Sequence, residues 1–173
     1  MALFMSISEG VPEIKLAKVK MKSIHGTASI PIFADMKQAE SQEDDVSIEG
    51  MRILLAEDNE LNMEIAEFLL TNAGAEITKA SNGKEAVEAF AKSGVGEINV
   101  ILMDIMMPVM DGLEATREIR TMNRSDASAV VIIAMTANAF TEDKTKALKS
   151  GMDDYLTKPL ESEKLIRALS RFL

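Results

Sequence analysis

The 173-residue sequence has no cysteine and no tryptophan, and it has a single histidine and a single tyrosine. Without cysteine the chain can form no disulfide, no thiolate metal site and no thiol nucleophile. Because the one histidine is His25, a metal site of several imidazoles and a Ser-His-Asp triad are both excluded after residue 50. Any metal bound there must therefore be a hard cation on oxygen ligands.

The sequence also lacks a long apolar run. No stretch approaches the roughly 18 residues of a transmembrane helix, and residues 1–10 have neither the basic start nor the long apolar core of an export signal. Basic residues number 19 against 28 acidic ones, and the formal net charge of −9 would repel nucleic-acid phosphates and anionic lipid. We therefore predict a cytoplasmic protein that binds no nucleic acid and makes no direct contact with a membrane.

Three segments differ in composition. Residues 1–35 contain two stretches, 13–22 and 27–33, in which apolar and polar residues alternate, and this alternation indicates a β-hairpin-like appendage. Residues 36–50 are polar and acidic, which is typical of a linker, and residues 51–173 carry the longer apolar runs of the main domain. An isolated hairpin is only marginally stable and its edges are open, so we expect the appendage to pack on another surface, for example in a homodimer.

From residue 51 onward, apolar runs alternate with segments of helical periodicity. The predicted strands are residues 52–56, 75–80, 98–103, 130–135 and 155–157. Five such βα units imply a doubly wound α/β fold, in which helices cover both faces of a five-stranded parallel sheet. The second strand alternates in polarity as an edge strand does, which favours the strand order 2-1-3-4-5.

Chemically active side chains follow the ends of these predicted strands. Glu57 and Asp58 follow the first strand, Asp104 the third, Thr136 the fourth and Lys158 the fifth. Parallel strands end at one edge of a sheet, so the topology gathers these residues. Three carboxylates repel one another, and Mg²⁺ is the simplest cation to neutralise them. With a hydroxyl and an ammonium group opposite, the set predicts phosphoryl transfer with Asp104 as the nucleophile.

Four motifs occupy these strand ends: LLAEDNELN at 54–62, ILMDIMMPVMDG at 101–112, IIAMTANAF at 132–140 and YLTKP at 155–159. Together they resemble the phosphoacceptor receiver domain of two-component signalling, over about residues 51–173. The combination of EDNELN with TANAF is most similar to receivers attached to hybrid sensor histidine kinases. The resemblance implies the flavodoxin-like receiver fold and a cytoplasmic domain, whose parent kinase can itself be anchored in a membrane.

We call the carboxyl groups of Glu57, Asp58 and Asp104 at the strand ends the acidic edge. The resemblance assigns a role to each of them and to Lys158. Asp104 matches the aspartate that accepts a phosphoryl group from phosphohistidine. Asp58 and Asp104 match the side chains that bind Mg²⁺ directly, together with the backbone carbonyl of Met106. Glu57 matches an acid that acts on the ion through water, and Lys158 matches the lysine that pairs with the phosphoryl group.

The resemblance also implies a conformational switch. Thr136 matches the hydroxyl that moves toward the phosphoryl group, and Tyr155 matches the aromatic residue that turns inward with it. The peptide bond between Lys158 and Pro159 is implied to be cis.

The segment MMPVMDG at 106–112 admits two structural interpretations. Its three methionines could fill the core or form a partner surface, and we favour a phosphate-site loop in which Gly112 opens the next helix. Met106 has no side-chain group to orient a hydrolytic water, whereas Asn138, two residues after Thr136, could orient one.

Three functions remain open at this point. The leading one is a receiver that catalyses only its own phosphorylation and dephosphorylation, with a phosphohistidine donor protein, a histidine kinase domain or a histidine-phosphotransfer protein as its partner. A magnesium-dependent phosphatase with an aspartyl nucleophile is the alternative, but such enzymes usually carry a second Asp where this chain has Met106. A degenerate receiver that only binds partners ranks third, since every residue needed for phosphorylation is present.

The first 35 residues add two weaker observations. Their ending, GTASIPIF, is loosely similar to the last strand of a histidine-kinase ATP-binding domain, which precedes the receiver in a hybrid kinase. The surroundings of His25 match neither a kinase phosphorylation box nor a histidine-phosphotransfer motif, so we interpret it as a turn residue.

Overall fold

The computed structural model describes residues 47–137 and 141–173. Five parallel strands form one sheet in the order β2-β1-β3-β4-β5, as the sequence predicted. The strands are β1 (Arg52–Ala56), β2 (Glu76–Ala80), β3 (Val100–Asp104), β4 (Val131–Thr136) and β5 (Asp154–Thr157). All four neighbouring pairs are parallel, so the carboxyl ends of the strands share one edge of the sheet.

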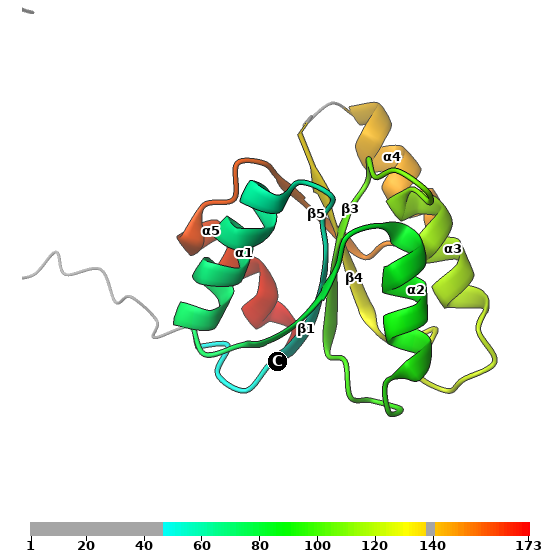
Figure 1. Ribbon diagram of the computed structural model, residues 1–173, viewed down its shortest axis with the longest axis horizontal. Coiled ribbons are helices and arrows are strands. Elements are labelled where there is room, and N and C mark those ends of the chain that lie inside the picture. Colours follow the sequence, from blue (N-terminus) through cyan, green and yellow to red (C-terminus); the bar gives the residue numbers. More distant parts are fainter. Residues whose placement is uncertain (1–46, 138–140) are drawn as a thin grey trace, which may run out of the picture. The chain divides into compact units, whose positions relative to one another are not determined.

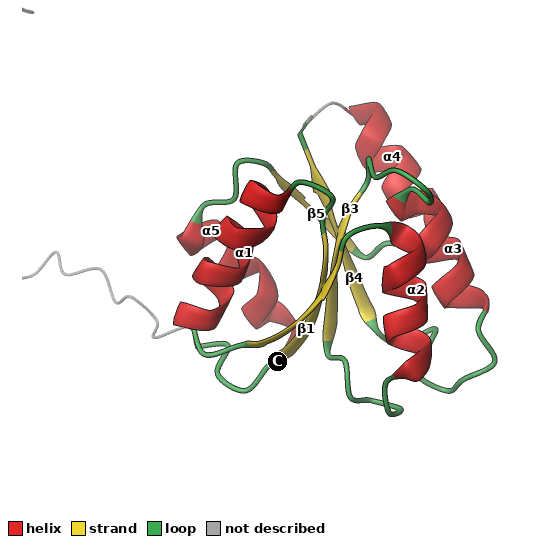
Figure 2. Cartoon of the chain, in the orientation of Figure 1, coloured by secondary structure: helices red, strands yellow, loops and turns green. Residues whose placement is uncertain are grey.

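Helices follow each strand and cover both faces of the sheet (Figures 1 and 2). They are α1 (Glu60–Asn72), α2 (Gly83–Lys92), α3 (Gly112–Thr121), α4 (Thr141–Ser150) and α5 (Ser162–Leu169), with a short 3-10 turn at Ser170–Phe172. In Figure 1, α1 and α5 lie on one side of the sheet and α2, α3 and α4 on the other. This arrangement explains why the middle strands are apolar up to their last residue, since each face packs on a layer of helices.

Each helical layer has its own apolar core. Leu70 of α1 and Leu165 of α5 lie in one cluster of buried residues, whereas Phe90 of α2 and Ile119 of α3 lie in the other. The edge strand β2 is largely exposed, which matches its alternating sequence. No helix among the described residues is both long enough and apolar enough to cross a membrane.

The third strand differs most in its bounds from the sequence-based expectation. The third strand was predicted to begin at Ile98, but the ladder begins at Val100, which is paired with Ile53. Ile98 is buried without belonging to the strand, so its apolar character reports burial and not strand pairing. The strand instead extends to Asp104, which pairs with Met135 of β4.

The linker was predicted to extend to residue 50, but the packed domain begins earlier. The Ile48 side chain is completely buried in the cluster formed by α1 and α5, and the Gly50 N–H donates a hydrogen bond to the Gly74 carbonyl at 2.9 Å. The polar run 37–50 has only two large apolar residues, Val46 and Ile48, which are too few for a periodic signal, so the sequence pattern missed the burial of Ile48. The predicted appendage at 1–35, with His25, lies outside the described residues.

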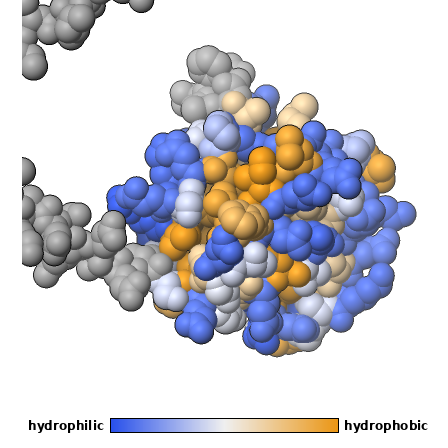
Figure 3. Space-filling view, turned by 60° about the vertical axis from the view of Figure 1, so that its left-hand side comes forward, coloured by the Kyte–Doolittle hydropathy of each residue, from blue (hydrophilic) through white to orange (hydrophobic). Residues whose placement is uncertain are grey.

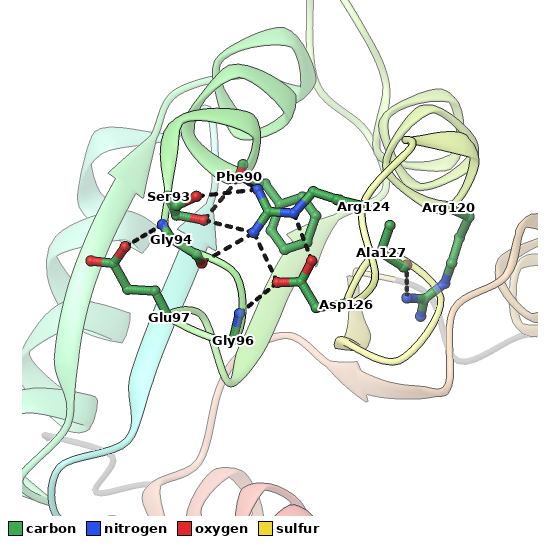
Figure 4. A network of polar contacts seen from close by, with 9 residues as sticks. All are labelled: Phe90, Ser93, Gly94, Gly96, Glu97, Arg120, Arg124, Asp126 and Ala127. Atoms are coloured by element: carbon green, nitrogen blue, oxygen red, sulfur yellow. Dashed lines mark hydrogen bonds and ion pairs between the residues drawn. The ribbon is translucent and has the colours of Figure 1, made fainter.

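An arginine joins the loops at the amino-terminal edge of β3 and β4 (Figure 4). The Arg124 guanidinium donates to both oxygens of Asp126 at 2.6 and 2.8 Å, and to the carbonyls of Phe90 and Gly94. It also lies 4.2 Å from the centroid of the Phe90 ring. Asp126 in turn accepts the Gly96 N–H at 2.8 Å, so the pair fastens the α3–β4 loop to the α2–β3 loop.

Both side chains of this pair are largely buried, with 12% and 13% of their surface exposed. The hydrogen bond from Arg124 holds the pKa of Asp126 well below its usual range. A carboxylate with such a lowered pKa in the folded state stabilises the fold above its unfolded-state pKa of about 3.9, and the contribution is lost as the pH falls toward the folded-state pKa.

Replacing Asp126 with Asn is therefore expected to lower the free energy of unfolding at pH 7 by roughly 1–3 kcal/mol, because Arg124 loses its charged partner. The difference from wild type should narrow below about pH 4, where Asp126 of the unfolded wild type becomes protonated. Urea denaturation at pH 7 and at acid pH measures both effects. As a control, Glu163→Gln removes an exposed ion pair with Arg167 and should cost less than about 1 kcal/mol. An equal loss of unfolding free energy at both pH values would contradict a stabilising role for the ionised Asp126 carboxylate.

Candidate functional site

The ammonium group of Lys158 lies between two buried carboxylates at the carboxyl edge of the sheet. Its Nζ donates to Asp104 Oδ2 at 2.6 Å and to Glu57 Oε2. Glu57 and Asp104 are only 3% and 5% exposed. The three residues are far apart in the chain, and they meet because β1, β3 and β5 all end at this edge, as the sequence analysis predicted.

Each acid is held by further donors. The Met106 N–H donates to Asp104 Oδ1 at 3.1 Å, and the Asn62 side-chain amide donates to Glu57 Oε1 at 3.0 Å. Asp58 is exposed beside them, and one carboxylate oxygen each from Glu57, Asp58 and Asp104 lies within 4.8 Å of the others. Three hard oxygen ligands at this spacing, two buried and one open to solvent, fit a magnesium ion.

Burial and charge act in opposite directions on the pair that Lys158 forms. Burial raises the pKa of Asp104 above its usual value, against the hydrogen bonds from Lys158 and Met106. Burial also acts to lower the pKa of Lys158, but the hydrogen bonds and the negative charges of Asp104 and Glu57 together outweigh it, and the pKa is raised. Three carboxyl groups face one ammonium group, so the site has an excess of acidic groups that a divalent cation would match.

Thr136 is the last residue of β4 and is buried at the same edge. Its carbonyl accepts the Lys158 N–H at 2.8 Å, which ties the end of β4 to the residue that carries the ammonium group. The peptide bond between Lys158 and Pro159 is cis, as the resemblance implied. The predicted water-orienting residue, Asn138, lies outside the described residues.

Tyr155 lies on β5 and packs partly buried against the core cluster of α2, α3 and α4. Lys144 of α4 lies over its ring, with Nζ 4.5 Å from the ring centroid and 3.4 Å from the phenolic oxygen. Sequence reasoning singled out Tyr155 but not Lys144. The spacing of the two residues along the chain gives no signal for this contact, because it joins a helix to a strand.

The methionines of the loop between β3 and α3 differ in burial. Met107 is buried in the core, whereas Met106 and Val109 are 79% and 80% exposed. Val109 has φ of 70°, and the Met110 N–H donates to the Pro108 carbonyl at 2.8 Å, so a tight turn presents Val109 to solvent.

Gly112 allows this loop to pass close to Asp104. Its N–H donates to the Ile105 carbonyl at 3.1 Å, and a Cβ at this position would overlap the backbone oxygen of Asp104. Gly112 is also the first residue of α3, as predicted, with Asp111 as the N-cap. Only glycine permits the helix to begin so near the acidic edge.

A family model for the response regulator receiver domain matches residues 53–170. The chain belongs to this family. The sheet order, the acidic edge and the lysine therefore belong to a receiver domain of two-component signalling, and the phosphatase and binding-only alternatives are not favoured.

The similar proteins include hybrid kinases. Hybrid signal transduction histidine kinase I of Dictyostelium discoideum is 42% identical over 121 residues, which are 69% of this chain and 7% of that protein. The aerobic respiration control sensor protein ArcB of Escherichia coli is 36% identical over 147 residues, which are 84% of this chain and 18% of that protein. The matched residues thus make up only a small part of the length of these relatives.

Two solved structures are informative neighbours. The receiver domain of the sensor histidine kinase PA1611 from Pseudomonas aeruginosa has a TM-score of 0.65 and 41% identity, covers 71% of this chain and 97% of its own, and holds a magnesium ion in its active-site cleft. The receiver domain of Ssk1 from Saccharomyces cerevisiae, solved with the phosphotransfer protein Ypd1, has a TM-score of 0.63 and 32% identity and covers 72% of this chain and 89% of its own.

Replacing Gly112 with Ala is expected to lower the free energy of unfolding by roughly 1–3 kcal/mol, because the added methyl group must displace the backbone of Asp104. The same displacement should disturb the acidic edge, visible as shifted amide resonances around residues 104–106. Gly94→Ala is the control, since its added methyl group meets only the flexible Glu97 side chain. A stable variant with unshifted resonances would show that the close approach is not needed.

Proposed function

We propose that Asp104 of this receiver domain accepts a phosphoryl group from a phosphohistidine protein, with Mg²⁺ bound at the acidic edge. One observation carries the proposal: the buried Asp104 carboxylate is held between a backbone N–H and the Lys158 ammonium group, next to two further acids. A nucleophile, a counter-charge and oxygen ligands for a hard cation are the groups that phosphoryl transfer requires.

The proposed reaction replaces one phosphorus bond with another. A carboxylate oxygen of Asp104 forms a bond to phosphorus, the P–N bond to the donor imidazole breaks, and its electron pair returns to the imidazole nitrogen, which takes up a proton. Lys158 already contacts the carboxylate and can move with it to the phosphoryl oxygens. The Met106 N–H fixes the orientation of the carboxylate.

Asp58 and Asp104 would hold the ion directly, with the Met106 carbonyl, and Glu57 would act through water. Support comes from the carboxylate oxygens that lie within 4.8 Å of one another, and from the magnesium ion in the cleft of the related Pseudomonas receiver. The ion supplies positive charge next to the transferred phosphoryl oxygens when it is bound.

Thr136 and Tyr155 are proposed to transmit the phosphorylated state. The buried Thr136 follows β4 at the same edge, and Tyr155 is the partly buried aromatic residue of the neighbouring strand β5. A hydroxyl that moves toward a new phosphoryl group would leave space that the Tyr155 ring can fill. The two residues then report phosphorylation to the surface formed by α4 and β5.

The first test is the intact mass after incubation with acetyl phosphate and Mg²⁺. Wild type should gain one phosphoryl group, Asp104→Asn should gain none, and removal of Mg²⁺ with a chelator should abolish the gain. Glu88→Gln, in an exposed ion pair on α2, is the control and should be phosphorylated like wild type. A phosphoryl group on Asp104→Asn would assign the chemistry to another residue.

An exposed apolar stripe on helix α1 is consistent with a donor protein as the partner. Leu61, Ile65 and Phe68 follow one another at helical spacing and are 64%, 45% and 63% exposed, so α1 turns an apolar stripe outward. Figure 3, in which the side of α1 and α5 comes forward, shows apolar side chains on this face. Ile65 also lines a pocket with Glu57 and Lys158, so the stripe reaches the acidic edge.

We propose that the α1 stripe (Leu61, Ile65 and Phe68) binds the protein that carries the phosphohistidine. A donor imidazole must come within bonding distance of Asp104, so its protein has to cover the surface around the pocket. The related Ssk1 receiver, which was solved with a phosphotransfer protein, supports a partner of this class.

Phe68→Ala is expected to lower kcat/KM for phosphoryl transfer from phosphorylated Ypd1 by roughly tenfold, because a few large interface side chains carry most of the binding energy. Phosphorylation by acetyl phosphate should be unchanged, because a small donor needs no docking surface. Val95→Ala, in the α2–β3 loop, removes an exposed apolar side chain far along the chain from α1 and is the control. An equal loss with both donors would locate the defect at the acidic edge and not in docking.

A further inference from the structure

Asn62 contacts the acidic edge without being one of its acids. Its side-chain Nδ2 donates to Glu57 Oε1 at 3.0 Å, and the Asn59 N–H lies 3.4 Å from the same oxygen. The other oxygen of Glu57 accepts the Lys158 ammonium group. The buried Glu57 carboxylate is therefore held by the first turn of α1 on one side and by the residue after β5 on the other.

The position of Asn62 in the helix is itself fixed. Asn59 is the N-cap of α1, and its side-chain oxygen accepts the Asn62 N–H at 3.0 Å. Side chains on a helix lean toward its amino terminus, so an amide in this first turn is directed back to the loop that carries Glu57. The amide is consequently in place before any ion binds.

The orientation of Glu57 matters because it shares Lys158 with Asp104. A carboxylate that rotates freely could take the ammonium group from Asp104, or withdraw its oxygen from the other two acids. Among the residues that the structure describes, only the longer 3.4 Å contact from Asn59 would remain on Oε1 if the Asn62 amide were absent. The amide thus holds Glu57 in the orientation in which Lys158 donates to Glu57 and to Asp104 at the same time.

We infer that Asn62 is a positioning residue for the metal site: by holding Glu57 Oε1, it keeps the carboxylate among the three acids and sets the affinity for Mg²⁺. The inference rests on the proposed function, in which Glu57 acts on the ion. Partners that orient the groups around a metal typically change its affinity by about 10–100-fold. We expect the lower end of this range, because Asn62 acts through an acid that itself acts through water.

The test is a calorimetric titration of the full chain with MgCl₂, which requires no phosphoryl transfer. Asn62→Ala and Asn62→Leu should bind Mg²⁺ about tenfold more weakly than wild type, and Asn62→Gln, which keeps an amide donor, should recover most of the affinity. Asn72→Ala is the matched control, since Asn72 is an exposed residue at the other end of the same helix. Thermal unfolding by circular dichroism should give similar melting temperatures for Asn62→Ala and Asn72→Ala.

Acetyl phosphate adds a second readout. The Mg²⁺ concentration for half-maximal phosphorylation should rise about tenfold in Asn62→Ala. Unchanged Mg²⁺ affinity in both Asn62→Ala and Asn62→Leu would overturn the inference. An equal loss of Mg²⁺ affinity in Asn72→Ala would also overturn it. Wild type that binds Mg²⁺ but gains no phosphoryl group would refute the proposed function while leaving the role of Asn62 standing. Wild type that binds no Mg²⁺ would remove both.

Discussion

The site depends on one ammonium group shared by two buried carboxylates. Burying two carboxyl groups, Glu57 and Asp104, is costly without a positive charge nearby, and Lys158 supplies that charge to both. The arrangement still leaves negative charge in excess, because Asp58 lies beside the pair. In the proposed function, this excess of negative charge attracts a divalent cation to the site.

The fold brings Glu57, Asp104 and Lys158 together although they are far apart in the sequence. The strands β1, β3 and β5 end at one edge, and the apolar residues of β3 and β4 anchor that edge between two layers of helices. Gly112 lets α3 start against the backbone of Asp104, while the Arg124–Asp126 pair fastens the loops at the opposite edge. The active edge can therefore carry buried charge because the rest of the domain is firmly packed.

In the proposed function, helix α1 connects the acidic edge to the surface that binds the partner. Its first turn holds Glu57 through Asn62, its buried side packs Leu70 into the core, and its outward side carries the apolar stripe that includes Phe68. The pocket that contains both Asn62 and Ile65 lies where these surfaces meet. A protein that docks on the stripe would consequently lie next to the groups that prepare the acidic edge.

The sequence by itself determined the strand order, the acidic edge and the family. Continuous apolar runs mark strands that are covered on both faces, and the motifs at their ends place Asp104, Thr136 and Lys158 in one location once the strands are parallel. Only the tertiary structure decided that Ile48 is core, that Asn62 holds Glu57 and that Lys144 lies over Tyr155. Periodicity records how one element meets its environment over several residues, whereas each of these three facts depends on a single side chain whose neighbours are set by the packing of separate elements.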